Sequence, residues 1–215
     1  MAMNQRGVRQ KTVRGHQHVV NYSLKAAVNK WGEKASSAAK DEMQQLLDRK
    51  VFHPIRTESI TPEERKKVLE SLLFVIEKRD GRIKARHCAN GSPQRAWIPA
   101  ENASSPTVST ESVLLTAIID AEEGRDVMTS DVPNAFVQTE HPLRDEDGAR
   151  TIMRIRALLV DILCELDPSY TEFVTTERNQ STLYVHITEA IYGLMVAAIL
   201  WYKKFRASIE KIDSK

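Results

Sequence analysis

The sequence predicts an α+β fold, because helical and strand-like segments follow one another without the regular βαβ rhythm of a doubly wound sheet. Apolar residues recur at helical spacing over 34–50 and again over 109–123. Two strand-like runs meet at Asp80-Gly81, a turn that needs glycine, which is typical of a β-hairpin. The composition is that of an ordinary globular protein, with 41% hydrophobic and 28% charged residues.

Two helices are expected before the hairpin. Apolar spacing predicts the first over 34–50, with Ser36 or Ser37 as its cap. The string Thr61-Pro62-Glu63-Glu64 is a strong start signal for the second. It combines a capping threonine, a proline in the first turn and a glutamate three residues after the cap. We expect this second helix to carry Val68, Leu69 and Leu72.

The hairpin is expected over Leu73–Lys78 and Arg82–Cys88, and the chain then changes from loop to helix to strand. Residues 90–107 are rich in Ser, Pro, Asn and Ala and are expected to form a loop. A helix is predicted over Ser109–Glu123, ended by Gly124. Its expected buried residues are Val113, Leu114, Ala117, Ile118 and Ala121. The run Arg125–Ser130 reads as a short strand that places Asp131 at its tip.

The rest of the chain continues the mixed pattern without an internal repeat. In order, we expect a strand over Thr151–Arg156, a helix over Ala157–Leu166 ended by Pro168, a strand over Leu183–Ile187 and a long helix over 189–212 with Gly193 near its start. These elements add to the α+β pattern of the first half.

Charge and cysteine content indicate which partners and which cellular compartment to expect. The formal net charge is only +2, so no global field points to nucleic acid. Residues 1–32 contain basic residues and no acid, which fits either a mobile basic arm or a solvated tail without a partner. The two cysteines form no CxxC pair, and the sequence shows neither a signal peptide nor an apolar run of bilayer length. We expect a soluble intracellular protein, cytoplasmic or nuclear, with no membrane partner.

A carboxylate at a strand tip is the first candidate for chemistry. Asp131 is placed to hold a metal ion there, with the ring of Phe136 on the following turn within reach of the same ligand. Most such carboxylates cap a helix or close a turn, and that alternative stays open. Phe136 is likewise either a pocket wall or an ordinary core residue.

A pair of cations in the hairpin is the second candidate. Lys84 and Arg86 lie two residues apart in a predicted strand, so their side chains share a face. Such a pair can grip a triphosphate, with arginine supplying a planar fork and lysine a point charge. The alternative is an ordinary exposed hairpin face. His87 and Cys88 have no partner at metal-ligand spacing and read as ordinary strand residues.

Five sequence blocks occur in an order typical of one protein family. They are DEMQQLLDRKVFHP (41–54), KRDGRIKAR (78–86), SSPTV (104–108), SDVPNAFVQ (130–138) and AIYGL with Trp201-Tyr202 (190–202). Together they resemble the reverse transcriptase domain of copia-type retrotransposons, from about Tyr22 to the end of the sequence. The resemblance implies a partial right-hand polymerase fold with an incomplete antiparallel sheet. Its divisions would be a basic arm over 1–33, a fingers-like region over 34–108 and a palm-like region over 109–215.

The resemblance also implies roles for matching residues. Asp131 would be the first catalytic aspartate and would bind Mg²⁺ together with the backbone carbonyl of Val132. The implied dNTP-binding residues are Lys84, Arg86, Phe136 and Gly193. The two cations would hold the triphosphate, the phenylalanine would exclude a ribose 2′-hydroxyl, and the glycine would leave room near the nascent base pair. The implied partners are an RNA or DNA template-primer, dNTPs and the remainder of a polyprotein.

Two departures from the family pattern qualify these roles. The family commonly has Lys-Gln-Ala-Pro-Arg after YGL, where this chain has Met195–Ile199. The family also has a second pair of aspartates further along, and this sequence reaches Lys215 before such a block. Two Mg²⁺ ions need more than one carboxylate, so we expect the chain alone not to polymerise DNA. A non-catalytic remnant that binds nucleic acid or a partner, and a degenerate copy without function, stay open as alternatives.

Overall fold

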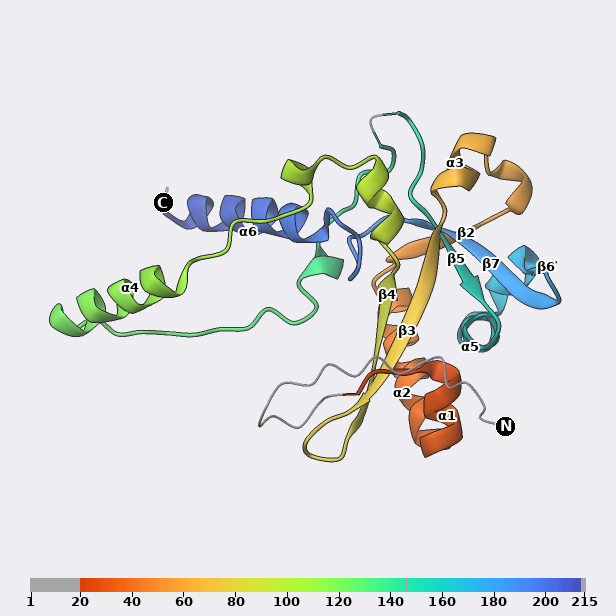
Figure 1. The fold of residues 1–215 in the computed structure, drawn as a ribbon, viewed down its shortest axis with the longest axis horizontal. Helices are drawn as coiled ribbons and strands as arrows, with labels where there is room; N and C mark the ends of the chain where they lie inside the picture. The colour runs from red at the N-terminus through yellow and green to blue at the C-terminus, as the bar shows by residue number, and fades with distance from the viewer. Residues whose placement is uncertain (1–19, 146, 214–215) are drawn as a thin grey trace, which may run out of the picture.

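A mixed seven-stranded sheet forms the centre of the protein, in a computed structural model that describes residues 20–145 and 147–213 (Figure 1). Its strands are β1 (Tyr22–Ser23), β2 (Phe52–Ile55), β3 (Leu69–Glu77), β4 (Ile83–Ala89), β5 (Ile152–Arg156), β6 (Thr175–Glu177) and β7 (Gln180–Ile187). The order is β1-β3-β5-β7-β2, with β4 paired to β3 and β6 paired to β7. The β3–β5 pair is parallel and the others are antiparallel. The α+β class is confirmed, but the expectation of an antiparallel sheet is wrong at β3–β5.

The predicted hairpin is confirmed as β3 and β4, which pair in register from Ser71–Ala89 to Glu77–Ile83. Gly81 closes its turn with φ +79°, a conformation that glycine adopts without a steric cost. The expected second helix is shorter than predicted, since α3 (Pro62–Lys67) ends before the leucines that we assigned to it. Leu69 is buried at the start of β3, where it pairs with Met153 of β5. Sheet pairing therefore overrides the helical spacing of these leucines.

Two helices pack near the hairpin, α1 (Leu24–Trp31) and α2 (Glu33–Asp48) (Figure 1). They are joined at Gly32, whose φ of +54° turns the chain between them. The helix predicted over 34–50 is thus confirmed as α2, but neither Ser36 nor Ser37 caps it, because Gly32 holds the cap position. Both helices bury small or apolar side chains in the core: Leu24, Ala27, Ala35, Ala39, Met43 and Leu46.

The segment predicted as a basic arm over 1–33 contains packed structure from Tyr22 onward. Tyr22 pairs with Val75 of β3, and Leu24 and Ala27 of α1 are buried. The part of the predicted arm over 1–19 lies outside the described residues.

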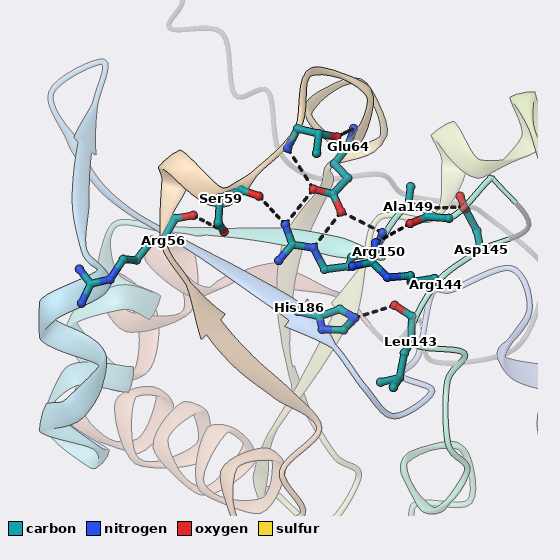
Figure 2. A network of polar contacts seen from close by, with 11 residues as sticks. Arg56, Ser59, Glu64, Leu143, Arg144, Asp145, Ala149, Arg150 and His186 are labelled. Atoms are coloured by element: carbon teal, nitrogen blue, oxygen red, sulfur yellow. Dashed lines mark hydrogen bonds and ion pairs between the residues drawn. The ribbon is translucent and has the colours of Figure 1, made fainter.

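A buried ion pair ties α3 to the start of β5 (Figure 2). The capping box predicted at Thr61 is present, since the Thr61 hydroxyl accepts from the Glu64 N–H and the Glu64 carboxylate accepts from the Thr61 N–H. The same carboxylate accepts from Nε and Nη2 of Arg150, each at 2.8 Å, and from its backbone N–H at 3.1 Å. Arg150 also donates to the Ser59 carbonyl at 2.7 Å. These bonds from Arg150 lower the pKa of Glu64 to about 2, against the opposing effect of burial.

The second half of the sheet follows the predicted order closely. The strand at 151–156 is confirmed as β5, the helix after it as α5 (Leu158–Leu166), and the strand at 183–187 as part of β7. Pro168 begins a 3₁₀ turn after α5, because proline has no backbone N–H with which to continue the helix. The main core joins the buried faces of α1, α2, α5 and the sheet.

Two helices project from the body on the same side, α4 (Thr110–Glu122) and α6 (Ala197–Asp213) (Figure 1). The helix predicted over 109–123 is confirmed as α4, with Ser109 as its cap, but the prediction that it buries an apolar face is wrong. Ile118 is 62% exposed, and none of its described residues is buried. The last helix begins at Ala197 and not at 189, because a turn at Gly193 with φ +92° precedes it. Among the described residues, no helix is long and apolar enough to cross a membrane.

Candidate functional site

The outer face of the hairpin carries the two predicted cations. Lys84 and Arg86 are exposed on β4 and alternate with the buried residues Ala85 and His87, so the two cations share a face as the spacing predicted. The guanidinium carbon of Arg86 lies 4.8 Å from the centre of the Tyr192 ring. This cation–π contact holds Arg86 against a fixed aromatic surface.

Tyr192 connects Arg86 to Phe136, which lies in the short 3₁₀ helix η4 (Phe136–Gln138). The Phe136 and Tyr192 ring centroids are 4.9 Å apart with an interplanar angle of 57°. Phe136 is half-buried: its side chain packs against the main core and is also partly exposed to solvent. Tyr192 was not among the predicted site residues. The sequence placed it on the last helix, with packing or base stacking as its role, whereas the structure places it before α6.

Gly193 holds the Tyr192 turn against the end of β4. The Ala89 N–H donates to the Tyr192 carbonyl at 2.8 Å, and a Cβ placed on Gly193 would lie 1.9 Å from the Ala89 carbonyl oxygen. A Cβ on Gly91 would likewise lie 2.0 Å from the Gly193 carbonyl oxygen. Only glycines allow two backbones to approach this closely. Contact with the β4 backbone therefore requires glycine at position 193, and the implied role of Gly193 beside a nascent base pair stays a prediction.

An open groove of about 460 Å³ lies beside this turn. Its lining includes Phe74 of β3, Arg95, Gly193 and Met195. Phe74 pairs with Arg86 across the hairpin, so the groove adjoins the Arg86–Tyr192–Phe136 cluster. In this setting Met195 donates its backbone N–H to the side-chain oxygen of Gln94 at 3.0 Å, which anchors the segment that departs from the family pattern.

His87 lies beneath this face and is a core residue. Its Nε2 is 2.8 Å from the Ser71 hydroxyl, and burial lowers its pKa to about 4. The ring is therefore neutral at physiological pH. Burial also raises the pKa of the Cys88 thiol, which disfavours a reactive thiolate. These positions match the interpretation of both as ordinary strand residues.

Asp131 is not at a strand tip, which corrects the prediction over Arg125–Ser130. This segment has no regular secondary structure and no pairing strand among the described residues. It lies exposed between α4 and η4, with Met128 88% accessible. A strand needs a neighbour that takes up its backbone hydrogen bonds, and none is described beside this one. The chain rejoins the body at Asn134, whose amide donates to Gln45 of α2 at 3.3 Å.

The predicted residues thus divide into two groups. Arg86, Phe136 and Gly193 come together around Tyr192, and Lys84 shares the face of Arg86. Asp131 is exposed, and no described contact joins it to that cluster.

The predicted Mg²⁺ site does not fit the residues present. Within residues 20–145 and 147–213, no group of three His, Cys, Asp or Glu side chains is arranged to hold a metal ion. Asp131 and the Val132 carbonyl would supply one carboxylate and one carbonyl oxygen, whereas two Mg²⁺ ions need more than one carboxylate to hold them. No chemical step is therefore derived through a metal.

Comparisons of this chain with protein-family models, with curated proteins and with solved structures each gave no match.

Proposed function

We propose that the chain belongs to an RNA-directed DNA polymerase of the copia type, and that its described residues alone do not hold the metal ions that catalysis needs. One observation carries the proposal: Arg86, Phe136 and Gly193 come from three separate sequence blocks and meet around one tyrosine. Arg86 is exposed and lies over the Tyr192 ring, which in turn packs on Phe136. This arrangement suits a site that receives a nucleotide, because it places a cation beside aromatic surface.

The cluster is suited to an anionic, planar ligand. Arg86 keeps its fork of N–H donors available, because no salt bridge to it is present in the described part of the chain. Lys84 adds a second positive charge on the same face. Together they would hold a triphosphate. The half-buried ring of Phe136 would restrict the sugar, and the groove beside Gly193 would take the base.

The proposed partner for catalysis is the remainder of the polyprotein. Three segments expose apolar side chains that a polypeptide would cover: α4, the stretch before Asp131 and the outer half of α6. Their exposed apolar residues include Leu114, Leu115, Ile118, Val127, Met128, Phe205 and Ile209. A helix whose apolar side chains cover most of its surface is stable in water only when another element packs on it. The added polypeptide would also supply the strand beside 125–130 and the further carboxylates.

We expect the purified chain to bind a deoxynucleoside triphosphate but not to extend a primer. Binding of a fluorescent dNTP should fall roughly tenfold in Arg86→Ala, because a charged hydrogen-bond donor is lost. Lys66→Ala, on exposed α3, removes the same charge type far from the cluster and serves as the control. Equal affinity of the Arg86→Ala variant and the wild type would contradict the proposal.

Primer extension with Mg²⁺ and dNTPs tests separately whether this chain catalyses synthesis. Synthesis by the chain alone would show that a second carboxylate pair is unnecessary. When a segment that carries an aspartate pair is fused to the chain, synthesis should appear and Asp131→Asn should abolish it.

The exposed face of α4 predicts an unusual response to polar substitution. Leu114→Gln and Ile118→Gln should change the free energy of unfolding by no more than about 0.5 kcal/mol, since both side chains already lie in water. They should also raise the monomeric fraction in size-exclusion chromatography, because we expect the wild-type chain to aggregate through this surface. Ile162→Gln in α5, at a buried position, is the matched control and should cost about 3 kcal/mol or more. Equal destabilisation at Ile118 and Ile162 would mean that α4 packs in the isolated chain.

A second candidate function, non-catalytic binding of nucleic acid, is favoured by a cationic groove at the other end of the hairpin.

A further inference from the structure

A wide groove of about 800 Å³ runs between α1 and the tip of the β3–β4 hairpin. Its lining residues are Val20, Tyr22, Lys30, Trp31, Ile76, Glu77, Lys78, Arg79, Asp80 and Arg82. The tip lies beside α1 at the lower edge of Figure 1. The Gly193 turn contacts the opposite end of the hairpin at Ala89, so this groove is separate from the site described above.

Two aromatic rings form one wall of the groove. Tyr22 and Trp31 meet edge to face, with centroids 4.9 Å apart and an interplanar angle of 78°. The Lys30 ammonium lies 4.5 Å and 4.4 Å from the two ring centres and donates to the Tyr22 hydroxyl at 2.9 Å. Both rings are half-buried and pack against the core, so they are held in place before any ligand arrives. Such a wall offers rigid aromatic surface at low entropic cost.

Positive charge dominates the opposite wall. Asp80 is already engaged by Arg82, whose Nε and Nη2 donate to it at 2.8 and 2.6 Å. Lys78 and Arg79 make no side-chain salt bridge within the described residues. Glu77 is the remaining acid in the lining, against Lys30, Lys78 and Arg79. The groove therefore has a net positive charge and two cations free to bind an anion.

We propose that this groove binds single-stranded nucleic acid, with the phosphates on Lys78 and Arg79 and an unpaired base against Trp31. Aromatic surface beside a cationic track is the combination by which proteins bind single strands without sequence preference. Rings recessed in a groove reach unpaired bases, whereas duplex bases are stacked inside the helix. The proposal deepens the second candidate function and does not depend on polymerase activity, since it uses none of the residues around Tyr192.

The charge contribution is tested with Lys78→Ala/Arg79→Ala in the full chain. The probe is a short fluorescein-labelled oligothymidylate, and an oligouridylate of equal length distinguishes DNA from RNA as the source of the ligand. Loss of two phosphate contacts should weaken binding about 25-fold near 0.1 M salt, and should reduce the slope of log K against log salt by about 1.4. The control is Lys66→Ala/Arg178→Ala, which removes the same charge from exposed positions on α3 and the β6–β7 turn. An equal loss of oligonucleotide affinity in the test and control double variants would overturn the proposal, because it would show that only the net charge of the protein matters.

The stacking contribution is tested by the fluorescence of Trp31. A Trp97→Phe/Trp201→Phe variant leaves Trp31 as the single tryptophan. Circular dichroism checks that this variant is folded. Saturating oligothymidylate should quench Trp31 emission, and the Lys78→Ala/Arg79→Ala change should shift the quenching curve to higher concentration. Binding without quenching would overturn the assignment of a base to Trp31. Equal competition by polyglutamate or by duplex DNA would also overturn the proposal, since neither presents an unpaired base. These outcomes are independent of dNTP binding at Arg86, so the two proposals fail separately.

Discussion

Replacing Arg150 by methionine should destabilise the protein by about 3–5 kcal/mol. Arg150 donates three hydrogen bonds to Glu64 and one to the Ser59 carbonyl, and the Glu64 side chain is only 3% exposed (Figure 2). The backbone N–H bond survives the substitution, but the guanidinium bonds do not. The substitution leaves a buried carboxylate without its counter-charge. The stability lost in this way is larger than the net stability that the intact ion pair provides over a pair of well-packed apolar side chains. Urea denaturation followed by far-UV circular dichroism measures the effect.

An exposed arginine supplies the matched control. Arg56 forms a salt bridge with Glu172 in which both side chains are 59% exposed. Arg56→Met should therefore cost less than about 1 kcal/mol, because water and salt screen the pair. A loss of similar size at Arg56 and Arg150 would contradict the view that burial makes the second pair critical.

The same ion pair predicts the acid sensitivity of the fold. The pKa of Glu64 is lowered from 4.5 to about 2 in the folded protein, mainly by hydrogen bonds from Arg150. A lowered carboxyl pKa stabilises the fold fully above the unfolded value, and the contribution is lost as pH falls from about 5 toward 2. A shift of this size corresponds to about 3 kcal/mol. Glu64→Gln should lose this component, so its unfolding free energy should depend less on pH in that window than the wild type does. Parallel pH profiles for the two proteins would contradict this assignment.

Gly193→Ala should destabilise the protein by about 2–4 kcal/mol. Its φ of +92° disfavours any side chain, and the added Cβ would lie 1.9 Å from the Ala89 carbonyl oxygen. That oxygen belongs to the backbone of β4 and cannot rotate away, so the turn must move. The shift would also displace Tyr192 from Arg86, and dNTP binding should weaken together with stability.

A substitution at Gly81 is the control that distinguishes the backbone strain at Gly193 from its steric clash with Ala89. Its φ is +79°, but a Cβ there would meet nothing within 4 Å. Gly81→Ala should cost only the conformational penalty, about 1 kcal/mol. Thermal melts of the two variants measure the difference. If Gly193→Ala is no worse than Gly81→Ala, the close contact with Ala89 is not maintained in solution.

Features encoded by neighbouring residues were predictable. The capping box at Thr61 and Glu64 follows from side chains three residues apart, and the turn at Gly81 follows from a backbone conformation that glycine permits. The shared face of Lys84 and Arg86 follows from the two-residue period of a strand. Each of these depends on interactions within a few residues, which the sequence lists directly.

Features that depend on a distant neighbour were not predictable in the same way. The spacing in α4 correctly indicated a helix, but burial of Leu114 or Ile118 requires another element to pack on it. The run Arg125–Ser130 was predicted to be a strand, but a strand forms only beside a partner, and none is described there. Leu69 joined a sheet because Met153 lies next to it, far along the chain.

The amino-acid sequence by itself determined α2, α4 and α5, the hairpin and the cationic face of β4, because periodicity and turn chemistry act over short distances along the chain. The tertiary structure alone decided that Tyr192 stands between Arg86 and Phe136, that Glu64 meets Arg150, and that Asp131 lies exposed and apart from them. Contacts of this kind depend on where the folded backbone brings separate segments together, and no local pattern records that arrangement.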